Sequence, residues 1–127
     1  MVVSQPESGQ DAFAIMQGLI ETGMCSLIVV DSVAALVPRE ETEEEDYGKS
    51  MVGVQARMMS KSLRKLSPIA ARNGTTIIYT NQQRTKIGIT YGDNQTTSGG
   101  SALKYYDSLR IKLTKIGSVD EGTGDDK

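Results

Sequence analysis

Apolar residues recur along the chain first with the period of a helix and later with the period of a strand. The first helical stripe consists of Ala12, Ile15, Met16, Leu19 and Ile20. This spacing predicts an amphipathic helix. Its start is marked by Ser8 with Asp11 three residues later, a pattern similar to a capping box, and Gly23 ends it.

Three short runs predict strands. Val2–Ser4 is the first, and Leu27–Val30 is continuously apolar, which is typical of a central parallel strand covered on both faces. With the helix between them, these runs predict a βαβ unit with a right-handed crossover. The run Thr75–Thr80 predicts a third strand.

A second, longer helical stripe lies between the second and third predicted strands. It consists of Val52, Ala56, Met59, Leu63, Leu66 and Ala70. The spacing predicts one buried helix face, and the adjacent pair Met58–Met59 is interpreted as packing. Pro68 is expected to kink this helix or to restart it with Ser67 as the cap, and Asn73–Gly74 to end it.

The remaining segments are predicted mainly as loops. Pro38 breaks a short apolar stretch, and the acidic segment that follows, through Gly48, has no periodicity. Residues 81–100 predict a long polar loop, and residues 101–104 one helical turn. Residues 106–116 alternate polar and apolar side chains, which predicts a half-exposed strand.

These elements together predict an α/β fold with a mainly parallel sheet flanked by helices. At 127 residues the chain is one domain or part of one. Cys25 is the single cysteine, which excludes an internal disulfide and favours a reducing compartment, and the absence of histidine argues against a zinc site. No apolar stretch approaches the length of a membrane span.

The net charge of −2 hides an uneven distribution. Six acids lie between Glu40 and Asp46, and four more between Asp120 and Asp126. From Arg57 to Lys115 there are eleven lysine or arginine residues against two acids, an excess of nine positive charges. Such a block predicts contact with a polyanion, and an ordinary solvated surface is the alternative.

The polar segment 81–100 is the first candidate for function, because a compact domain seldom has so long a loop without a binding role. Arg84 and Lys86 near its start offer charge, and its glycines allow a phosphate backbone to approach closely. Gly99–Gly100 are expected to offer consecutive backbone N–H groups to an anion.

Two further features suggest a nucleotide site and a basic surface. Asp31 ends an apolar strand, where an acid commonly holds nucleotide-bound Mg²⁺, although many such acids are only turn caps. Gln82 is predicted to lie at the same sheet edge, where it either touches a phosphate or satisfies its own backbone. Arg57, Lys61 and Arg64 share one helix face, which is either a solvated face or part of the same binding surface.

Three motifs carry a family resemblance: LIVVDSVAALVP, VGVQARMMSKSLRKL and NQQRTKIGITYGDNQTTSGGSALKYYDSLRIKLTKIG. In this order and spacing they strongly resemble the bacterial and phage RecA recombinases, over essentially the whole chain. The resemblance implies a RecA-like P-loop NTPase core, in a cytoplasmic, ATP-driven filament that pairs single-stranded with double-stranded DNA. The implied roles are DNA recombination, DNA repair and the SOS response to DNA damage.

The resemblance also implies residue roles, with ATP and Mg²⁺ as cofactors of the complete protein. Asp31 is the Walker B acid, binding Mg²⁺ through water, with Ser32 beside it, and Gln82 senses the γ-phosphate. Lys104 and Tyr105 match a subunit interface, and Ile87 the residue that wedges between bases. The implied DNA-contact positions are Val52, Arg57, Ser60, Arg64, Arg84, Lys86, Ile87, Gly88, Ser98, Gly99, Gly100 and Ser101.

The sequence departs from the family pattern in one important respect: it contains no GxxxxGK[ST] phosphate loop. We therefore expect a partial core over residues 1–117, an acidic truncated end over 118–127, and no catalytic residue in this segment. The leading interpretation is part of a DNA-dependent ATPase of the RecA type. The alternatives are a non-catalytic DNA-binding or filament-interfering module and a RecA-like helicase core.

Overall fold

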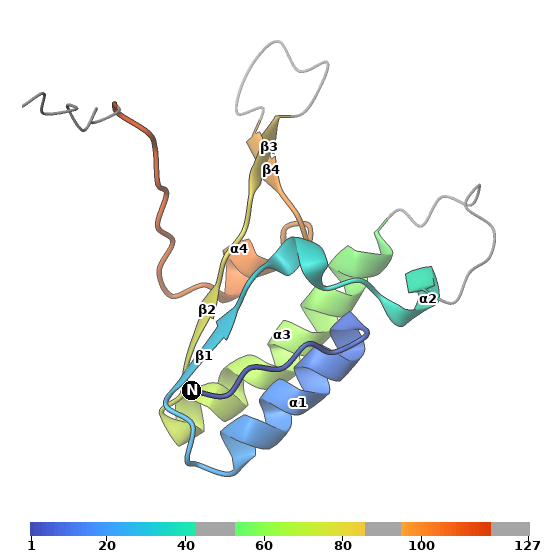
Figure 1. Cartoon of the computed structure of the whole chain (residues 1–127), viewed down its shortest axis with the longest axis vertical. Coiled ribbons are helices and arrows are strands. Elements are labelled where there is room, and N and C mark those ends of the chain that lie inside the picture. Colours follow the sequence, from blue (N-terminus) through green and yellow to red (C-terminus); the bar gives the residue numbers. More distant parts are fainter. Residues whose placement is uncertain (43–52, 86–94, 118–127) are drawn as a thin grey trace, which may run out of the picture.

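The computed structural model describes residues 1–42, 53–85 and 95–117. Its elements are α1 (Gly9–Glu21), β1 (Leu27–Val30), the 3₁₀ turn η1 (Val33–Ala35), α2 (Arg39–Thr42), α3 (Val54–Asn73), β2 (Thr76–Tyr79), β3 (Gln83–Thr85), β4 (Gln95–Thr97) and α4 (Ala102–Tyr106). Figure 1 shows α1, α3 and the strands β1 and β2 packed together, with β3 and β4 extending away from them.

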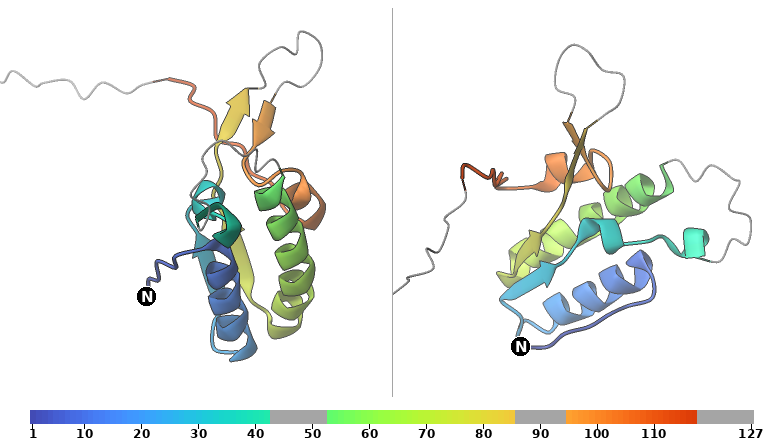
Figure 2. Two further views of the ribbon diagram at one scale, coloured as in Figure 1. Left: turned by 90° about the vertical axis from the view of Figure 1, so that its right-hand side faces the viewer. Right: turned by 45° about the horizontal axis from the view of Figure 1, so that its top comes forward.

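The predicted α/β organisation is confirmed by the pairing of β1 with β2. The two strands are parallel, with Leu27 opposite Thr76 and Val30 opposite Tyr79. The chain between them passes through η1, α2 and α3. Figure 2 shows α1 and α3 side by side on the same face of these strands. The carboxyl ends of β1 and β2 therefore lie at one edge, which is where the candidate site is found.

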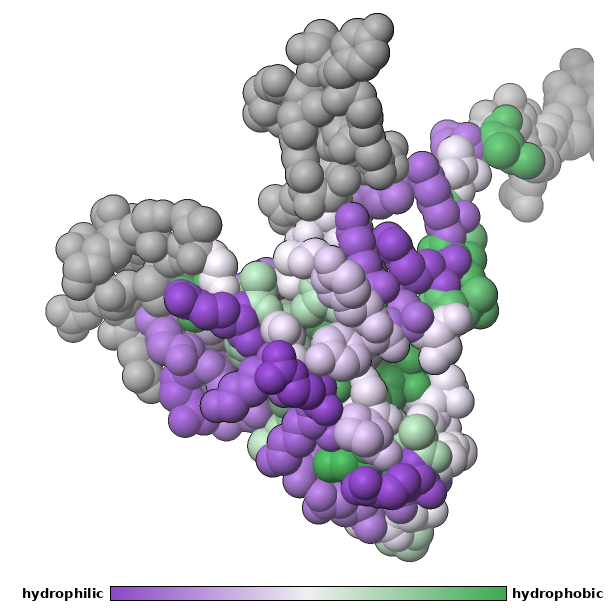
Figure 3. Space-filling view, turned by 180° about the vertical axis from the view of Figure 1, so that it is seen from behind, coloured by the Kyte–Doolittle hydropathy of each residue, from purple (hydrophilic) through white to green (hydrophobic). Residues whose placement is uncertain are grey.

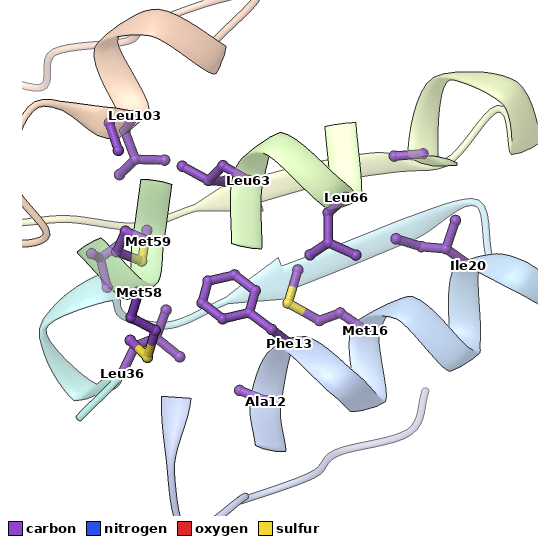
Figure 4. Close-up of a cluster of buried hydrophobic side chains, with 13 residues drawn as sticks. Ala12, Phe13, Met16, Ile20, Leu36, Met58, Met59, Leu63, Leu66 and Leu103 are labelled. Carbon is purple, nitrogen blue, oxygen red and sulfur yellow. The ribbon is translucent and has the colours of Figure 1, made fainter. Parts of the chain in front are cut away.

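Side chains of α1 and α3 form the core. Phe13 and Met16 of α1 point toward Leu66 of α3, and Leu103 of α4 lies beyond Leu63 (Figure 4). Within the core cluster, Ile28 and Val30 of β1 and Ile77 and Tyr79 of β2 pack against these buried residues. The predicted stripe on α3 is confirmed for Met59, Leu63, Leu66 and Ala70, and Met58 is buried with them.

Local signals set the ends of both long helices as predicted. The Ser8 hydroxyl accepts a hydrogen bond from the Asp11 N–H at 3.2 Å and donates to the Asp11 carboxylate at 2.5 Å. At the C-terminal end of α3, Gly74 caps the helix with a φ of 65°, a conformation that favours glycine. In contrast to the predicted restart at Ser67, α3 continues through Pro68, because Leu66 and Ala70 on either side are both buried in the core.

The prediction that the central strand is covered on both faces is wrong for the described residues. Leu27, Val29 and Ile78 point away from the helices and are 52%, 56% and 46% exposed. The predicted strand at Val2–Ser4 is also absent, since these residues pair with no described strand. Figure 3, the view from behind, shows hydrophobic residues exposed between hydrophilic ones.

The predicted strand over residues 106–116 is likewise wrong here. Tyr106 ends α4, and residues 107–117 form no regular structure. Leu109, Ile111 and Leu113 are 77%, 78% and 92% exposed. An alternating pattern becomes a strand only when another strand supplies backbone hydrogen bonds, and none of the described strands does so. The face of α1 was also predicted incompletely, because Phe13 is buried while Ile15 and Leu19 are about 40% and 39% exposed.

The described ends of the polar segment after β2 form a two-stranded ribbon, where the sequence predicted a loop. β3 and β4 pair antiparallel, with Gln83 opposite Thr97 and Thr85 opposite Gln95. Residues 86–94 between them, like residues 43–52 of the acidic segment and 118–127 at the acidic end, lie outside the described residues. The ribbon begins three residues after Thr80, so it continues directly from the end of β2 (Figure 1).

Candidate functional site

Asp31 directly follows β1, as predicted, and its side chain is exposed. The hydroxyl of Thr80, the residue after β2, donates a 2.7 Å hydrogen bond to the Asp31 carboxylate. The peptide bond between Asp31 and Ser32 is cis. The backbone of the two strand ends is joined again where the Val33 N–H donates to the Thr80 carbonyl at 3.0 Å.

The donor set at this edge fits Mg²⁺ only as part of a larger shell. Among the described residues no group of three or more His, Cys, Asp or Glu side chains could hold a metal ion. Asp31 supplies a single carboxylate, with Ser32 beside it. A hard cation takes about six oxygen ligands, so nucleotide phosphates and water would have to provide the rest.

The amide of Asn81 connects this edge to the far end of the polar segment. Its Nδ2 donates to the Ser98 carbonyl at 3.0 Å, and its Oδ1 accepts from the Gln82 N–H at 2.8 Å. Gln82 is exposed at the same edge as Asp31, as predicted. Thr80 thus contacts Asp31, and Asn81 contacts Ser98 at the end of the polar segment. The next residue, Gln82, faces the solvent.

The glycine pair is packed tightly against α3 and η1. Gly99 and Gly100 have φ values of 82° and 72°. A Cβ added at Gly99 would lie 2.9 Å from Val33 Cγ1, and one at Gly100 would lie 2.7 Å from the Ala56 Cβ. Only glycine fits both the conformation and the space.

One part of the predicted anion cradle is wrong. The N–H of Gly99 donates to the side-chain oxygen of Gln55 at 3.2 Å, and Gly99 is buried. This donor is therefore already used inside the protein. Gly100 is exposed, so of the two glycines Gly100 is the one that presents its backbone to the solvent.

The structure brings several predicted residues together around an open hollow. Arg57 and Ser60 of α3 face Ser101 and Tyr105 across a space of about 330 Å³. Ala56, Ala102 and Tyr106 complete its lining. A guanidinium with four hydroxyl-bearing side chains offers hydrogen-bond donors and one positive charge, which suits a phosphate group.

Other predicted residues lie outside this hollow. Arg64 is exposed further along α3, and Lys104 is exposed on α4. Arg84 belongs to β3, where its backbone pairs with Thr96. Val52, Lys86, Ile87 and Gly88 lie outside the described residues.

Two titratable groups, Tyr79 at the end of β2 and Asp107 directly after α4, have shifted pKa values. The hydroxyl of Tyr79 is buried without a hydrogen-bond partner in the described part of the chain, and burial, with the nearby Asp107 charge, raises its pKa. Burial also raises the pKa of Asp107, which the Arg110 charge partly offsets.

Sequence reasoning missed two residues that connect the site. Thr80 was treated only as the end of a strand, yet its hydroxyl binds Asp31. Gln55 was not singled out, yet its amide contacts both η1 and Gly99. The sequence did offer a signal for Thr80. This residue carries a hydroxyl and directly follows the apolar run of the predicted strand 75–80, just as Asp31 directly follows the neighbouring apolar run. Gln55 had no comparable signal, because an amide on a helix is ordinarily solvated.

Comparison with known proteins agrees with this geometry. The RecA N-terminal domain family matches residues 1–126. The chain is 50% identical to Protein RecA 1 of Myxococcus xanthus over 122 residues, which are 96% of this chain and 35% of that protein. It is 48% identical to Protein RecA of Chlorobaculum tepidum, over 96% of this chain and 35% of that protein.

Protein RecA of Deinococcus radiodurans is 51% identical over 117 residues, which are 92% of this chain and 32% of that protein. The chain thus spans about a third of the length of the curated relatives it matches. In the described part, no helix combines the length and apolar character needed to cross a bilayer. The family match covers nearly every residue, and the chain therefore belongs to the RecA family.

Proposed function

We propose that this chain is part of a RecA-type recombinase that binds single-stranded DNA and ATP and promotes homologous pairing and strand exchange in DNA repair. The observation that carries the proposal is the continuous connection between the acid edge and the glycine pair. Thr80 bonds Asp31, and the next residue, Asn81, bonds the carbonyl next to Gly99. A change at the nucleotide edge would therefore reach the DNA-facing segment through two consecutive residues.

The proposed DNA surface combines the basic face of α3 with the polar segment. Arg57 and Arg64 are exposed one above the other along α3, and Gly100 is exposed beside Ala56. Cations aimed at phosphates bind without reading base identity, so binding should be insensitive to sequence. Gly99 is not among the proposed contacts, because it is buried and its N–H binds Gln55. The proposed contacts are Val52, Arg57, Ser60, Arg64, Arg84, Lys86, Ile87, Gly88, Ser98, Gly100 and Ser101.

The proposed nucleotide-coupled residues are Asp31, Ser32 and Gln82. Asp31 would hold Mg²⁺ through water, and Gln82 would report the nucleotide state to the segment beyond it. The sequence given contains no GxxxxGK[ST], so we expect no DNA-stimulated ATP hydrolysis from the 127-residue chain by itself. DNA-stimulated hydrolysis that disappears in Asp31→Ala would contradict this.

Self-association into a filament is also proposed for the complete protein, with Lys104 and Tyr105 in the subunit contact. Tyr105 is 82% exposed on α4, and large exposed aromatic side chains are enriched in protein interfaces. Tyr105→Ser should weaken assembly on DNA in a chimera in which this chain replaces the matching segment of Protein RecA 1. Assembly equal to that of the unsubstituted chimera would remove Tyr105 from the contact.

The nucleotide coupling is tested in a chimera in which this chain replaces the matching 122-residue segment of Protein RecA 1. ATP should raise the affinity of the chimera for single-stranded DNA. In Gln82→Ala, ATP should still bind but should no longer raise that affinity. Unchanged nucleotide dependence in the variant would show that Gln82 is not the coupling residue.

DNA binding by the chain itself is tested by fluorescence anisotropy on mixed-sequence single strands over a salt series. Arg57→Gln should weaken binding to every sequence and reduce the salt slope by about 0.7 for the lost phosphate contact. Arg72→Gln is the matched control, because Arg72 is exposed on the same helix about 22 Å further along its axis. Equal affinity and slope for all three proteins would mean that the basic face is only a solvated surface.

A second candidate function is a non-catalytic DNA-binding or filament-interfering module, which the exposed Tyr105 and the exposed Arg57 would serve without nucleotide. The discriminating experiment adds the 127-residue chain to strand exchange by a complete RecA protein. A module of this kind should inhibit the reaction in proportion to its concentration. Inhibition that Tyr105→Ser abolishes would place the interference in the subunit contact, and no inhibition would exclude this function.

A further inference from the structure

The side chain of Gln55 contacts three separate parts of the backbone. Its Nε2 donates to the carbonyls of Val33 and Leu36, both at 3.1 Å. Its Oε1 accepts from the N–H of Gly99 at 3.2 Å. Both amide hydrogens and the amide oxygen are therefore in use, and the opposite orientation would set like groups against one another.

These contacts join the two walls of the hollow. Gln55 lies in the first turn of α3, directly before Ala56 and Arg57, which line one wall. Gly99 lies just before Ser101 and Ala102, which line the other. The hydrogen bond from Gly99 to Gln55 thus connects one wall to the other, beside the packing of Ala102 and Leu103 in the same core as α3.

The same amide also holds the turn that follows the acid-bearing strand. Val33 and Leu36 lie in and directly after η1, two and five residues after Asp31. Val33 is fully buried, and it is the nearest neighbour of a Cβ added at Gly99. Gln55 and the Gly99–Val33 contact therefore act on the same junction, one through hydrogen bonds and the other through packing.

We infer that Gln55 is a positioning residue, which holds the Gly99–Gly100 backbone and the Arg57 face of α3 in one fixed arrangement for binding a single-stranded DNA backbone. This inference rests on the proposed function. Gln55 itself carries no charge and supplies no contact to the phosphates. Its contribution is to fix the geometry before DNA arrives, which avoids an ordering cost at binding.

The test measures single-stranded DNA affinity and salt slope for the 127-residue chain with Gln55→Met, which keeps the length and removes all three hydrogen bonds. We expect a loss of affinity of about tenfold, with the salt slope unchanged because no charge is removed. Gln17→Met is the matched control, since Gln17 bonds only Glu21 on the exposed surface of α1. Its affinity should stay within about twofold of the unsubstituted chain.

A second variant, Gln55→Glu, separates positioning from folding. At about pH 7.5 its carboxylate accepts from Gly99 but cannot donate to the two carbonyls, so affinity should fall; at about pH 5 the neutral acid regains a donor. Facing two carbonyls raises the carboxyl pKa, which brings this recovery into reach. The chain contains no histidine, so the unsubstituted chain provides a reference over the same range. The affinity of the variant relative to this reference should rise as the pH falls.

The outcomes separate the two proposals. If the unsubstituted chain does not bind single-stranded DNA, the proposed function fails and the inference fails with it. If that chain binds and Gln55→Met binds equally well, only the inference is overturned. It is also overturned if Gln55→Met lowers the salt slope as Arg57→Gln does, because Gln55 would then contact DNA. If Gln55→Met does not fold, a pH-independent affinity ratio for Gln55→Glu overturns the inference.

Discussion

Replacing Gly99 by alanine tests whether the glycine pair is fixed by packing as well as by conformation. Gly99 has a φ of 82°, and an alanine in this region costs roughly 1–2 kcal/mol. The added Cβ would also lie 2.9 Å from Val33 Cγ1 and 3.3 Å from Met59 Cγ. Both neighbours are fully buried, and Val33 is a branched side chain with little rotamer freedom.

Overpacking of this kind costs a further 1–3 kcal/mol, by a rough estimate, so Gly99→Ala should lower the free energy of unfolding by about 2–5 kcal/mol. Gly74→Ala is the matched control. Gly74 has a φ of 65°, but a Cβ there has no atom within 4 Å, so only the conformational cost of about 1–2 kcal/mol applies. The assay is urea denaturation of the three proteins, followed by circular dichroism and extrapolated linearly to water.

A double variant checks the origin of the difference. In Gly99→Ala combined with Val33→Ala, the atom nearest to the new Cβ is gone and only the 3.3 Å contact with Met59 Cγ remains, so the cost of the added methyl group should fall toward that of Gly74→Ala. The coupling between the two substitutions should be about 1–3 kcal/mol. If Gly99→Ala and Gly74→Ala are equally destabilising, or if the two substitutions are additive, the packing argument is refuted.

Three other predictions concern the core, the helix cap and pH. Leu66→Ala should destabilise the chain by about 2–5 kcal/mol, measured by urea denaturation, because Leu66 is only 2% exposed between α1 and α3. Ser8→Ala should cost about 1 kcal/mol in the same assay, since the Asp11 N–H loses its acceptor and the Asp11 carboxylate its donor, and Ser8→Thr, which keeps the hydroxyl, should recover most of it. Burial raises the pKa of Asp107 above 3.8, so its stabilising contribution is complete below about pH 3.8 and is lost as the pH rises through the folded-state pKa. Asp107→Asn should therefore stabilise the chain at neutral pH, and urea midpoints that match the unsubstituted chain at every pH would contradict this.

Elements with strong local signals could be predicted from the sequence. The cap at Ser8, the end of α3 at Gly74 and the stripe through Leu63 and Leu66 depend on neighbouring residues of one helix. The parallel pair β1 and β2 was predictable because each is a short apolar run bounded by turn residues. Asp31 could be placed at the sheet edge for the same reason, since the end of an apolar strand fixes the position of the next residue.

Features that depend on a distant partner could not be predicted in this way. The alternation through Leu109 and Ile111 is a strand pattern, but residues 107–117 have no described strand to pair with. The β3–β4 ribbon was missed because polar residues such as Gln83 and Thr97 carry no apolar alternation. The contact of Gln55 with Gly99 joins residues 44 positions apart, and no local pattern encodes such a hydrogen bond.

The continuity of α3 has a consequence for how the length of the chain can vary. Its 20 residues form one helix, with Gln55 and Arg57 in the first turns and the core stripe from Met59 onward. A single inserted residue between these two parts would rotate one against the other by about 100° and shift it by about 1.5 Å. The site would then face a different direction while the core remained packed. Insertions and deletions within α3 should therefore turn the basic face away from its present direction, because the helix fixes the rotation of that face relative to the core.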